Sequence, residues 1–480
     1  MATAELTAPS RVDWTKVLTF GAVFVAAVLA TASGLGAGEG SKMAVVLPVA
    51  IGAGMVLGVL ALTRFQIYVM IMLFARSSLD LAKLSQRTAG TTSVGTSSRA
   101  LDPSSILAVL FLLAAGVWLA AQYRYKGSLP GSPLRRALLV FLAAGAVSVV
   151  GSNNITSSAL ETLRICAVVT MFVVLEQMIT SMNKAKEILL AAMLSLVIPL
   201  AYTTYGFLSG HPKSDVKGGY TRISGTFNQS NDYGRFLMLM IIMGVALYPH
   251  IERKWRRPLA AMLALSGVFL FFTYTRSALV ACGLGLVIIG LVQSKRLLGG
   301  LIVVGMAGLL VVPSLSGRFT DLTQYQAKQL TTTGGSNGGN TLAWRLNYWT
   351  EVLPLANSNP VTGIGLNQTK YSTNQAKQPH NDFIRAYVET GLVGFGAYVA
   401  MMISLLALGR RAVRKTRRGT IERGVAAGFL GCATAFLAVS LVANVISNVV
   451  NLWYIIAFAA CASAVVRVAD RREAMASLPA

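Results

Sequence analysis

Long apolar stretches recur from one end of the 480-residue chain to the other and restrict what it can fold into. A helix needs about 17–25 mostly apolar residues to cross a bilayer. Fourteen candidate spans lie near residues 14–36, 43–63, 65–82, 104–122, 136–151, 158–182, 186–206, 234–250, 257–274, 276–293, 296–313, 385–409, 424–443 and 447–468. Some are short, so we expect about 12 full spans, within a range of about 11–14. With 54% hydrophobic and 12% charged residues, the chain is predicted to be an all-α polytopic integral membrane protein.

The net charge of +24 is concentrated in short basic segments between the apolar stretches. Seven basic residues lie in 410–423, and others lie in 252–257 and near the C-terminal end. Basic residues in alternate short loops follow the positive-inside rule, and this distribution argues against nucleic-acid binding. With 410–423 and both termini in the cytoplasm, residues 207–233, the turn at 275–276 and residues 314–384 lie on the opposite side.

This topology divides the chain into five parts. They are N-terminal transmembrane helices (1–206), a non-cytoplasmic loop (207–233), central transmembrane helices (234–313), a long non-cytoplasmic loop (314–384), and C-terminal transmembrane helices with a basic cytoplasmic tail (385–480). A hydrophilic insertion as long as the second loop is uncommon unless it is functional or disordered. Within it, residues 341–353 are predicted to form a helix and residues 359–372 a series of turns. Residues 331–340 fit a spacer and a substrate lid equally well.

Four polar clusters fall on the non-cytoplasmic side of this topology. They contain Arg222, Asn228 and Asn231; Arg276; Arg345; and His380 with Asn381. Arg276 lies between two apolar runs, which is costly in a bilayer unless its guanidinium reaches the headgroups or meets an anion. A planar guanidinium is well suited to binding phosphate. Taken singly, Arg222 and Arg345 also fit solvated charges, but the side they share with Arg276 favours a phosphate site. Arg318 is a weaker candidate.

His380 is the candidate general base, because a neutral imidazole takes up a proton near neutral pH. The other two histidines are poorer candidates. His250 lies on the cytoplasmic side, and His211 lies in a loop without comparable polar neighbours.

Other residues that often act as ligands are interpreted as structural. Arg164 is expected to pair with Glu161, three positions earlier. The four cysteines fall inside apolar segments without the spacing of metal ligands. The sequence also has no D-x-D, H-E-x-x-H or P-loop motif. We therefore expect no metal or other cofactor, so that arginines neutralise any bound phosphate.

These motifs resemble those of the O-antigen ligases, within the broader O-antigen ligase/polymerase membrane superfamily. The ligase pattern of H-[N/S/Q], nine residues and G-x-x-[G/T/Y] is complete at His380, Asn381, Gly391 and Gly394. Further superfamily elements are similar to Arg222, Gly225, Phe227, Asn228 and Asn231; to "TYTRS" with Arg276; to Arg345, Trp349, Pro360, Gly363 and Gly365; and to Arg318 with Leu322. The resemblance covers 220–394, whereas the first 200 residues agree only in hydropathy.

The resemblance implies a GT-C-like glycosyltransferase of the bacterial inner membrane with its active site facing the periplasm. The donor would be O-antigen polysaccharide on undecaprenyl pyrophosphate, and the acceptor a sugar hydroxyl of lipid A–core oligosaccharide. It also implies a reaction without metal or ATP that inverts the anomeric configuration. The implied roles are His380 as base, Arg222, Arg276, Arg345 and Arg318 at the pyrophosphate, and Asn381, Asn228 and Asn231 orienting the histidine or the sugars. Gly391 and Gly394 are expected to permit close helix packing.

Alternatives stay open on sequence alone. An O-antigen polymerase would use the same donor and extend a lipid-linked chain, and a protein O-oligosaccharyltransferase would modify a pilin serine or threonine. A transporter or flippase would use Arg276 in a substrate path, although no internal repeat is visible. A membrane scaffold accounts for the hydropathy but not for polar residues gathered on one side. The intact histidine pattern favours a ligase.

Overall fold

The computed structural model describes residues 42–81, 103–129, 131–217, 220–296, 298–300 and 341–477. The chain divides into two compact units, residues 1–72 and 73–480. Helix α2 (Lys42–Thr63) belongs to the first unit, and α3 (Phe65–Arg76) runs across the division. The elements discussed below belong to the second unit.

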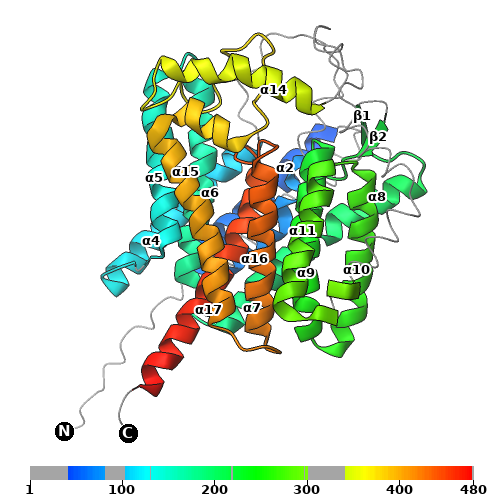
Figure 1. Cartoon of the computed structure of the whole chain (residues 1–480). Helices are drawn as coiled ribbons and strands as arrows, with labels where there is room; N and C mark the ends of the chain where they lie inside the picture. The colour runs from blue at the N-terminus through cyan, green and yellow to red at the C-terminus, as the bar shows by residue number, and fades with distance from the viewer. Residues whose placement is uncertain are drawn as a thin grey trace, which may run out of the picture. The chain divides into compact units, whose positions relative to one another are not determined.

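The second unit consists mainly of long apolar helices (Figure 1). They are α4 (Pro103–Lys126), α5 (Pro133–Ser148), α6 (Ile155–Met178), α7 (Met182–Leu194), α8 (Val197–Leu208), α9 (Ser230–Leu247), α10 (Arg253–Phe272), α11 (Arg276–Gln293), α15 (Asp382–Arg414), α16 (Ile421–Ser440) and α17 (Val449–Ala476). Among the described residues, 10 segments are long and apolar enough to cross a membrane, and α7 and α8 together form one of them. The predicted all-α polytopic membrane protein is confirmed. The predicted span at 14–36 and nearly all of that at 296–313 lie outside the described residues.

Helix α17 is the most deeply buried of these helices. Every residue from Tyr454 to Val466 is buried, as expected for a helix that is apolar on all sides. Its alanine-rich middle lets α6, α7, α15 and α16 approach its backbone closely. Helix α17 therefore provides the core against which the neighbouring elements are positioned.

Most of the described polar segments predicted to share one side gather at one end of these helices. Figure 1 shows helix α14 (Thr341–Val352) and the hairpin of β1 (Ser214–Lys217) and β2 (Tyr220–Ile223) at that end, and the connection from α15 to α16 at the opposite end. The strands are antiparallel, with Ser214 opposite Ile223. This hairpin is a small departure from the all-helical expectation. The predicted helix at 341–353 and the turns at 359–372 are both present.

Helix α15 is broken at Gly391, which has φ +65° and ψ −169°. A Cβ at this position would lie 2.1 Å from the carbonyl oxygen of Val361, so both the backbone conformation and the close approach require glycine. Gly391 therefore permits a close approach, as expected, but its neighbour is the turn at 361–362 instead of a helix, and it lies at a break in α15. At Gly394 a Cβ would lie 1.9 Å from Thr390 Oγ1 of the same helix, and at an ordinary van der Waals distance of 3.5 Å from the Cβ of Ala144 on α5.

The break in α15 is stabilised by the turn that carries Pro360, Gly363 and Gly365. The carbonyl groups of Val388 and Glu389, next to the break, accept hydrogen bonds from the amides of Ile364 at 3.1 Å and Gly365 at 3.0 Å. Gly363 has φ +74°, and a Cβ there would lie 2.4 Å from the carbonyl of Glu389. The motif of Pro360, Gly363 and Gly365 and the motif of Gly391 and Gly394 therefore contact each other through their main chains.

Candidate active site

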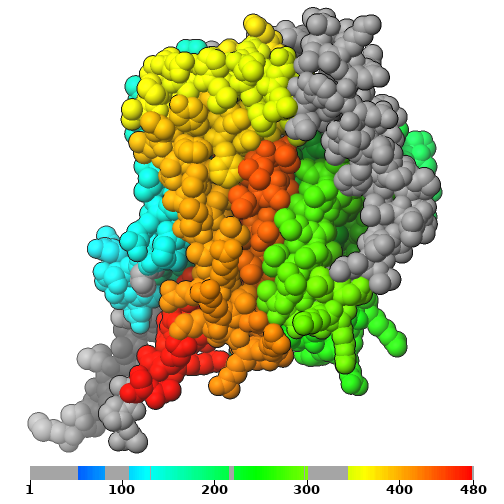
Figure 2. Space-filling view, viewed as in Figure 1, coloured from blue at the N-terminus to red at the C-terminus, as the bar shows by residue number. Residues whose placement is uncertain are grey.

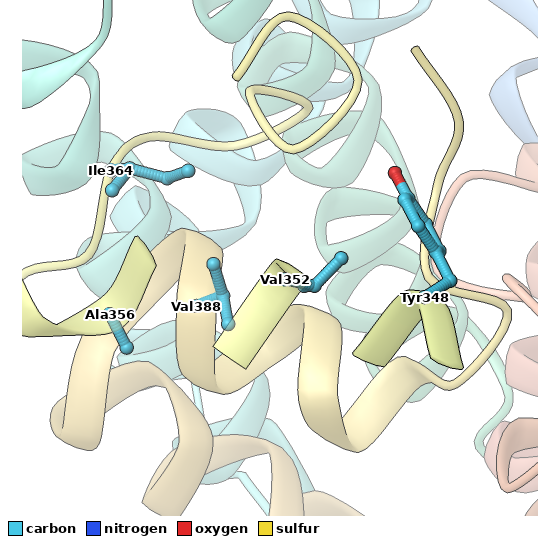
Figure 3. Close-up of a cluster of buried hydrophobic side chains, with 5 residues drawn as sticks. All are labelled: Tyr348, Val352, Ala356, Ile364 and Val388. Atoms are coloured by element: carbon cyan, nitrogen blue, oxygen red, sulfur yellow. The ribbon is translucent and has the colours of Figure 1, made fainter. Parts of the chain in front are cut away.

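Helix α14 covers the end of α15 that carries His380. Tyr348 and Val352 of α14 pack with Ala356, Ile364 and Val388 in a buried apolar cluster (Figure 3). In the space-filling view, the residues from α14 to the start of α15 form a continuous surface above α15 and α16 (Figure 2). The long loop thus contains a folded cover that is anchored to α15.

Aromatic side chains of α14 hold the segment that leads to His380. Trp344 Nε1 donates to Gln375 Oε1 at 2.7 Å, the Tyr348 hydroxyl donates to the carbonyl of Lys377 at 2.5 Å, and Trp349 Nε1 donates to the carbonyl of Pro379 at 2.7 Å. The Trp344 ring also meets the His380 ring edge to face, with 5.8 Å between centroids. Trp349, which belongs to the same motif as Arg345, therefore fixes the residue immediately before the candidate base.

His380 itself has a left-handed backbone conformation, with φ +55°, which is uncommon for a residue other than glycine. Asn444 holds this conformation from the segment between α16 and α17. Its Oδ1 accepts from the amide of His380 at 2.8 Å, and its Nδ2 lies 3.3 Å from His380 Nδ1. A single asparagine thus contacts both the main chain and the ring of the histidine.

The two residues after His380 connect it to the same segment. Asn381 caps α15, because its Oδ1 accepts from the amides of Phe383 and Ile384. The buried Asp382 carboxylate accepts from the amides of Val445 at 2.9 Å and Ile446 at 3.3 Å. The start of α15 and the segment that carries Asn444 are therefore held together.

Arg222 is buried and stabilises the turn before Arg276. Its Nε donates to the carbonyl of Thr273 at 2.8 Å, and its Nη2 donates to Asn231 Oδ1 at 2.6 Å and to Thr275 Oγ1 at 3.1 Å. Arg276 is the first residue of α11 and directly follows this turn. The sequence-predicted Arg222, Asn231 and Arg276 are thus brought together.

Arg345 lies close enough to two further arginines for their charges to act on it. Burial lowers the pKa of the Arg345 guanidinium, and the positive charges of Arg235 and Arg276 lower it further. Arg235, on the second turn of α9, is absent from the sequence-predicted set. A charged residue inside an apolar span is the signal that could have identified it.

A second charged cluster lies just before the break in α15, and the sequence did not predict it. Arg385 is only 1% exposed, and it contacts Glu389 at 2.8 Å and Glu161 at 3.2 Å. Glu389 also accepts from the amide of Asn367 at 2.7 Å. Arg164 pairs with Glu161 at 3.2 Å, as predicted. This cluster joins α6 and α15 to the turn at Asn367, which follows Gly365.

Arg318 lies outside the described residues, and Asn228 is half-buried near the start of α9. In the part of the chain that the structure describes, no three histidine, cysteine or acidic side chains gather to hold a metal ion.

Fold and site together define a multi-pass membrane protein with clustered arginines and a histidine at one end of its helices. Residues 259–399 match the family model described as O-Antigen ligase. This match confirms the resemblance to the O-antigen ligase family that is seen in the motifs. The match includes Arg276, Arg345 and His380 and ends before Asn444. A comparison with curated proteins gives no match. A match to this family implies a glycosyltransferase-like enzyme of the O-antigen ligase/polymerase superfamily.

Asn444→Asp is expected to move the acid limb of the pH–rate profile for glycan transfer upward by about 1 pH unit. A carboxylate beside His380 stabilises the imidazolium, which has no free lone pair to accept a proton. If His380 is the general base, its imidazole then becomes available only at higher pH. The measurement is transfer rate against pH between 5 and 9 at saturating donor. Asn444→Ala serves as the control and should slow transfer without this shift. An unchanged acid limb in Asn444→Asp would disconnect Asn444 from proton transfer at His380.

Proposed function

We propose that this protein is an O-antigen ligase. It transfers O-antigen polysaccharide from undecaprenyl pyrophosphate to a sugar hydroxyl of lipid A–core oligosaccharide, at the periplasmic face of the bacterial inner membrane. The observation that carries this proposal is that Arg345, which the charges of Arg235 and Arg276 affect, lies on the same helix as the residues that hold the segment before His380. Trp344 and Arg345 are neighbours on α14, and Trp344 contacts the histidine ring.

The proposed reaction exchanges one bond at the anomeric carbon. The acceptor oxygen forms a bond to this carbon from the face opposite the leaving group, which inverts its configuration. The bond to the pyrophosphate oxygen breaks, and its electron pair leaves with undecaprenyl pyrophosphate. The arginine cluster stabilises the charge that develops on this group.

His380 takes the proton from the acceptor hydroxyl in this proposal, because a neutral sugar hydroxyl is a weak nucleophile. The Asn444 side chain contacts both the main-chain amide and Nδ1 of His380, so it orients the imidazole. We assign Asn444 to this positioning of the base.

The choice of acceptor tests the proposal. Purified protein is given undecaprenyl-pyrophosphate-linked glycan together with lipid A–core oligosaccharide, a second lipid-linked glycan or a pilin peptide, each in turn. A ligase shifts the size of lipid A–core and leaves the other two acceptors unchanged. Extension of the lipid-linked glycan would instead identify a polymerase, and modification of the peptide a protein O-oligosaccharyltransferase.

A further inference from the structure

We propose that Arg235 is a phosphate-binding residue of this site, and that Arg222 positions Arg276 instead of binding the anion itself. This inference rests on the proposed function, because it names the residues that recognise the pyrophosphate of the donor. It differs from the sequence-based expectation in two ways. It adds an arginine that no motif contains, and it gives a different role to one that a motif does contain.

Arg235 has a buried guanidinium with one hydrogen-bond donor that the described residues do not use. Its side chain is almost entirely buried, and Nη1 pairs with Asp232 Oδ1 at 3.2 Å. Its Nε is also buried and has no hydrogen-bond partner in the described part of the chain. Buried donors of charged groups are rarely left without an acceptor. A phosphate oxygen of a bound ligand would be a suitable acceptor for the Nε of Arg235.

Arg345 provides a second donor of the same kind. Its Nε is buried and likewise has no hydrogen-bond partner among the described residues. The charges of Arg235 and Arg276 both act on Arg345. Because both charges repel that of Arg345, a multivalent anion bound between these side chains removes an unfavourable interaction as well as forming new ones.

The packing of α9 explains how Arg235 comes close to Arg276. A Cβ at Gly234 would lie 2.8 Å from Thr273 Oγ1 and 3.0 Å from Thr275 Oγ1. The backbone of α9 therefore contacts the turn directly before Arg276, with no side chain between them. Arg235 follows Gly234 in the chain, so the two arginines belong to one contact between α9 and the start of α11.

The carboxylates in this region leave the cluster with excess positive charge. Asp232 pairs with Arg235 and is itself partly exposed. Asp382 is used by the amides of Val445 and Ile446. Asp215 lies opposite Arg222 in the hairpin and accepts from the Ser230 hydroxyl. Arg222, Arg235, Arg276 and Arg345 therefore outnumber these three carboxylates of the described residues, which favours binding of an anion.

Arg222 differs from Arg235 because its guanidinium is occupied by the protein. Both Nε and Nη2 donate within the α10–α11 turn or to Asn231 on α9. These bonds fix the backbone that presents Arg276. Replacing Arg222 should consequently act through Arg276, whereas replacing Arg235 should remove an independent contact.

The test measures binding of undecaprenyl pyrophosphate to the full-length protein in detergent, for wild type and for Arg235→Gln, Arg222→Gln and Arg276→Gln alone and in pairs. Arg235→Gln is expected to weaken binding about 10- to 100-fold. The double variant with Arg276→Gln should bind more weakly than either single variant, because each arginine provides its own contact to the anion. Arg222→Gln should add little to Arg276→Gln. The matched probe is undecaprenyl monophosphate, for which Arg235→Gln should have a smaller effect.

Binding by Arg235→Gln within twofold of wild type would overturn the role of Arg235. A multiplicative effect of Arg222→Gln and Arg276→Gln would overturn the positioning role of Arg222. If Arg235→Gln does not fold, Arg235→Lys keeps the charge without the planar fork, and its affinity should fall several-fold at an unchanged melting temperature. Wild type that binds undecaprenyl pyrophosphate but transfers no glycan would contradict the proposed function alone.

Discussion

His380→Ala is expected to lower the rate of glycan transfer about 10²- to 10⁴-fold, the usual contribution of a positioned general base. The variant keeps the arginine cluster, so its affinity for undecaprenyl pyrophosphate should stay within a few-fold of wild type. The measurement is single-turnover transfer to lipid A–core, followed by the size of the product. Thermal unfolding of the same preparation shows whether the variant is folded.

His211→Ala is the matched control for this experiment. His211 is exposed, and its Nδ1 lies 2.7 Å from the carbonyl oxygen of Ser209, away from the contacts described for His380. Its loss should leave transfer within twofold of wild type. Normal transfer by a folded His380→Ala protein would remove His380 from the mechanism, and a loss in both variants would indicate a general effect of histidine replacement.

Arg385→Leu should destabilise the protein by about 3–5 kcal/mol, because it leaves buried carboxylates without their cation. Arg385 is the common partner of Glu161 and Glu389, which are themselves almost fully buried. Glu389 in turn holds the turn at Asn367. The free energy of unfolding is measured by titration with sodium dodecyl sulfate in mixed micelles.

Arg164→Ala provides the control, because Arg164 pairs with the same Glu161 from a side chain that is 37% exposed. Exposed ion pairs contribute about 0–1 kcal/mol, so this variant should unfold almost as wild type does. Equal destabilisation by Arg164→Ala and Arg385→Leu would show that burial of the charge is not the cause. A stable Arg385→Leu would mean that the cluster does not hold the break in α15 in place.

Hydropathy and charge were sufficient to predict the all-α membrane fold and the gathering of polar residues at one end. These properties follow from span length and from basic loops, which are local in the sequence. The motif residues Arg276, Arg345 and His380 were identified in the same way. The break at Gly391 was not predicted. The turn of Pro360, Gly363 and Gly365 that contacts the break lies about 30 residues earlier, and the spacing within each motif gives no information about this contact.

Asn444 and Arg235 illustrate what sequence reasoning missed and why. Asn444 lies 64 positions from His380, and its relevance depends on how the segment between α16 and α17 is held by Asp382. Arg235 belongs to an apolar span. A charge in such a span indicates a functional residue, but Arg235 was not among the predicted site residues. The hydrogen bonds of Arg222 to Thr273, Thr275 and Asn231 could not be predicted either. A loop arginine on the correct side looks the same in sequence whether it binds a ligand or the protein's own polar groups.

Transfer in proteoliposomes tests the central claim most directly. Purified protein is reconstituted with glycan on undecaprenyl pyrophosphate and with lipid A–core, and both products are measured. The account predicts a size shift of lipid A–core accompanied by release of an equal amount of undecaprenyl pyrophosphate. Movement of the lipid-linked glycan across the bilayer with lipid A–core unchanged would contradict it and identify a transporter.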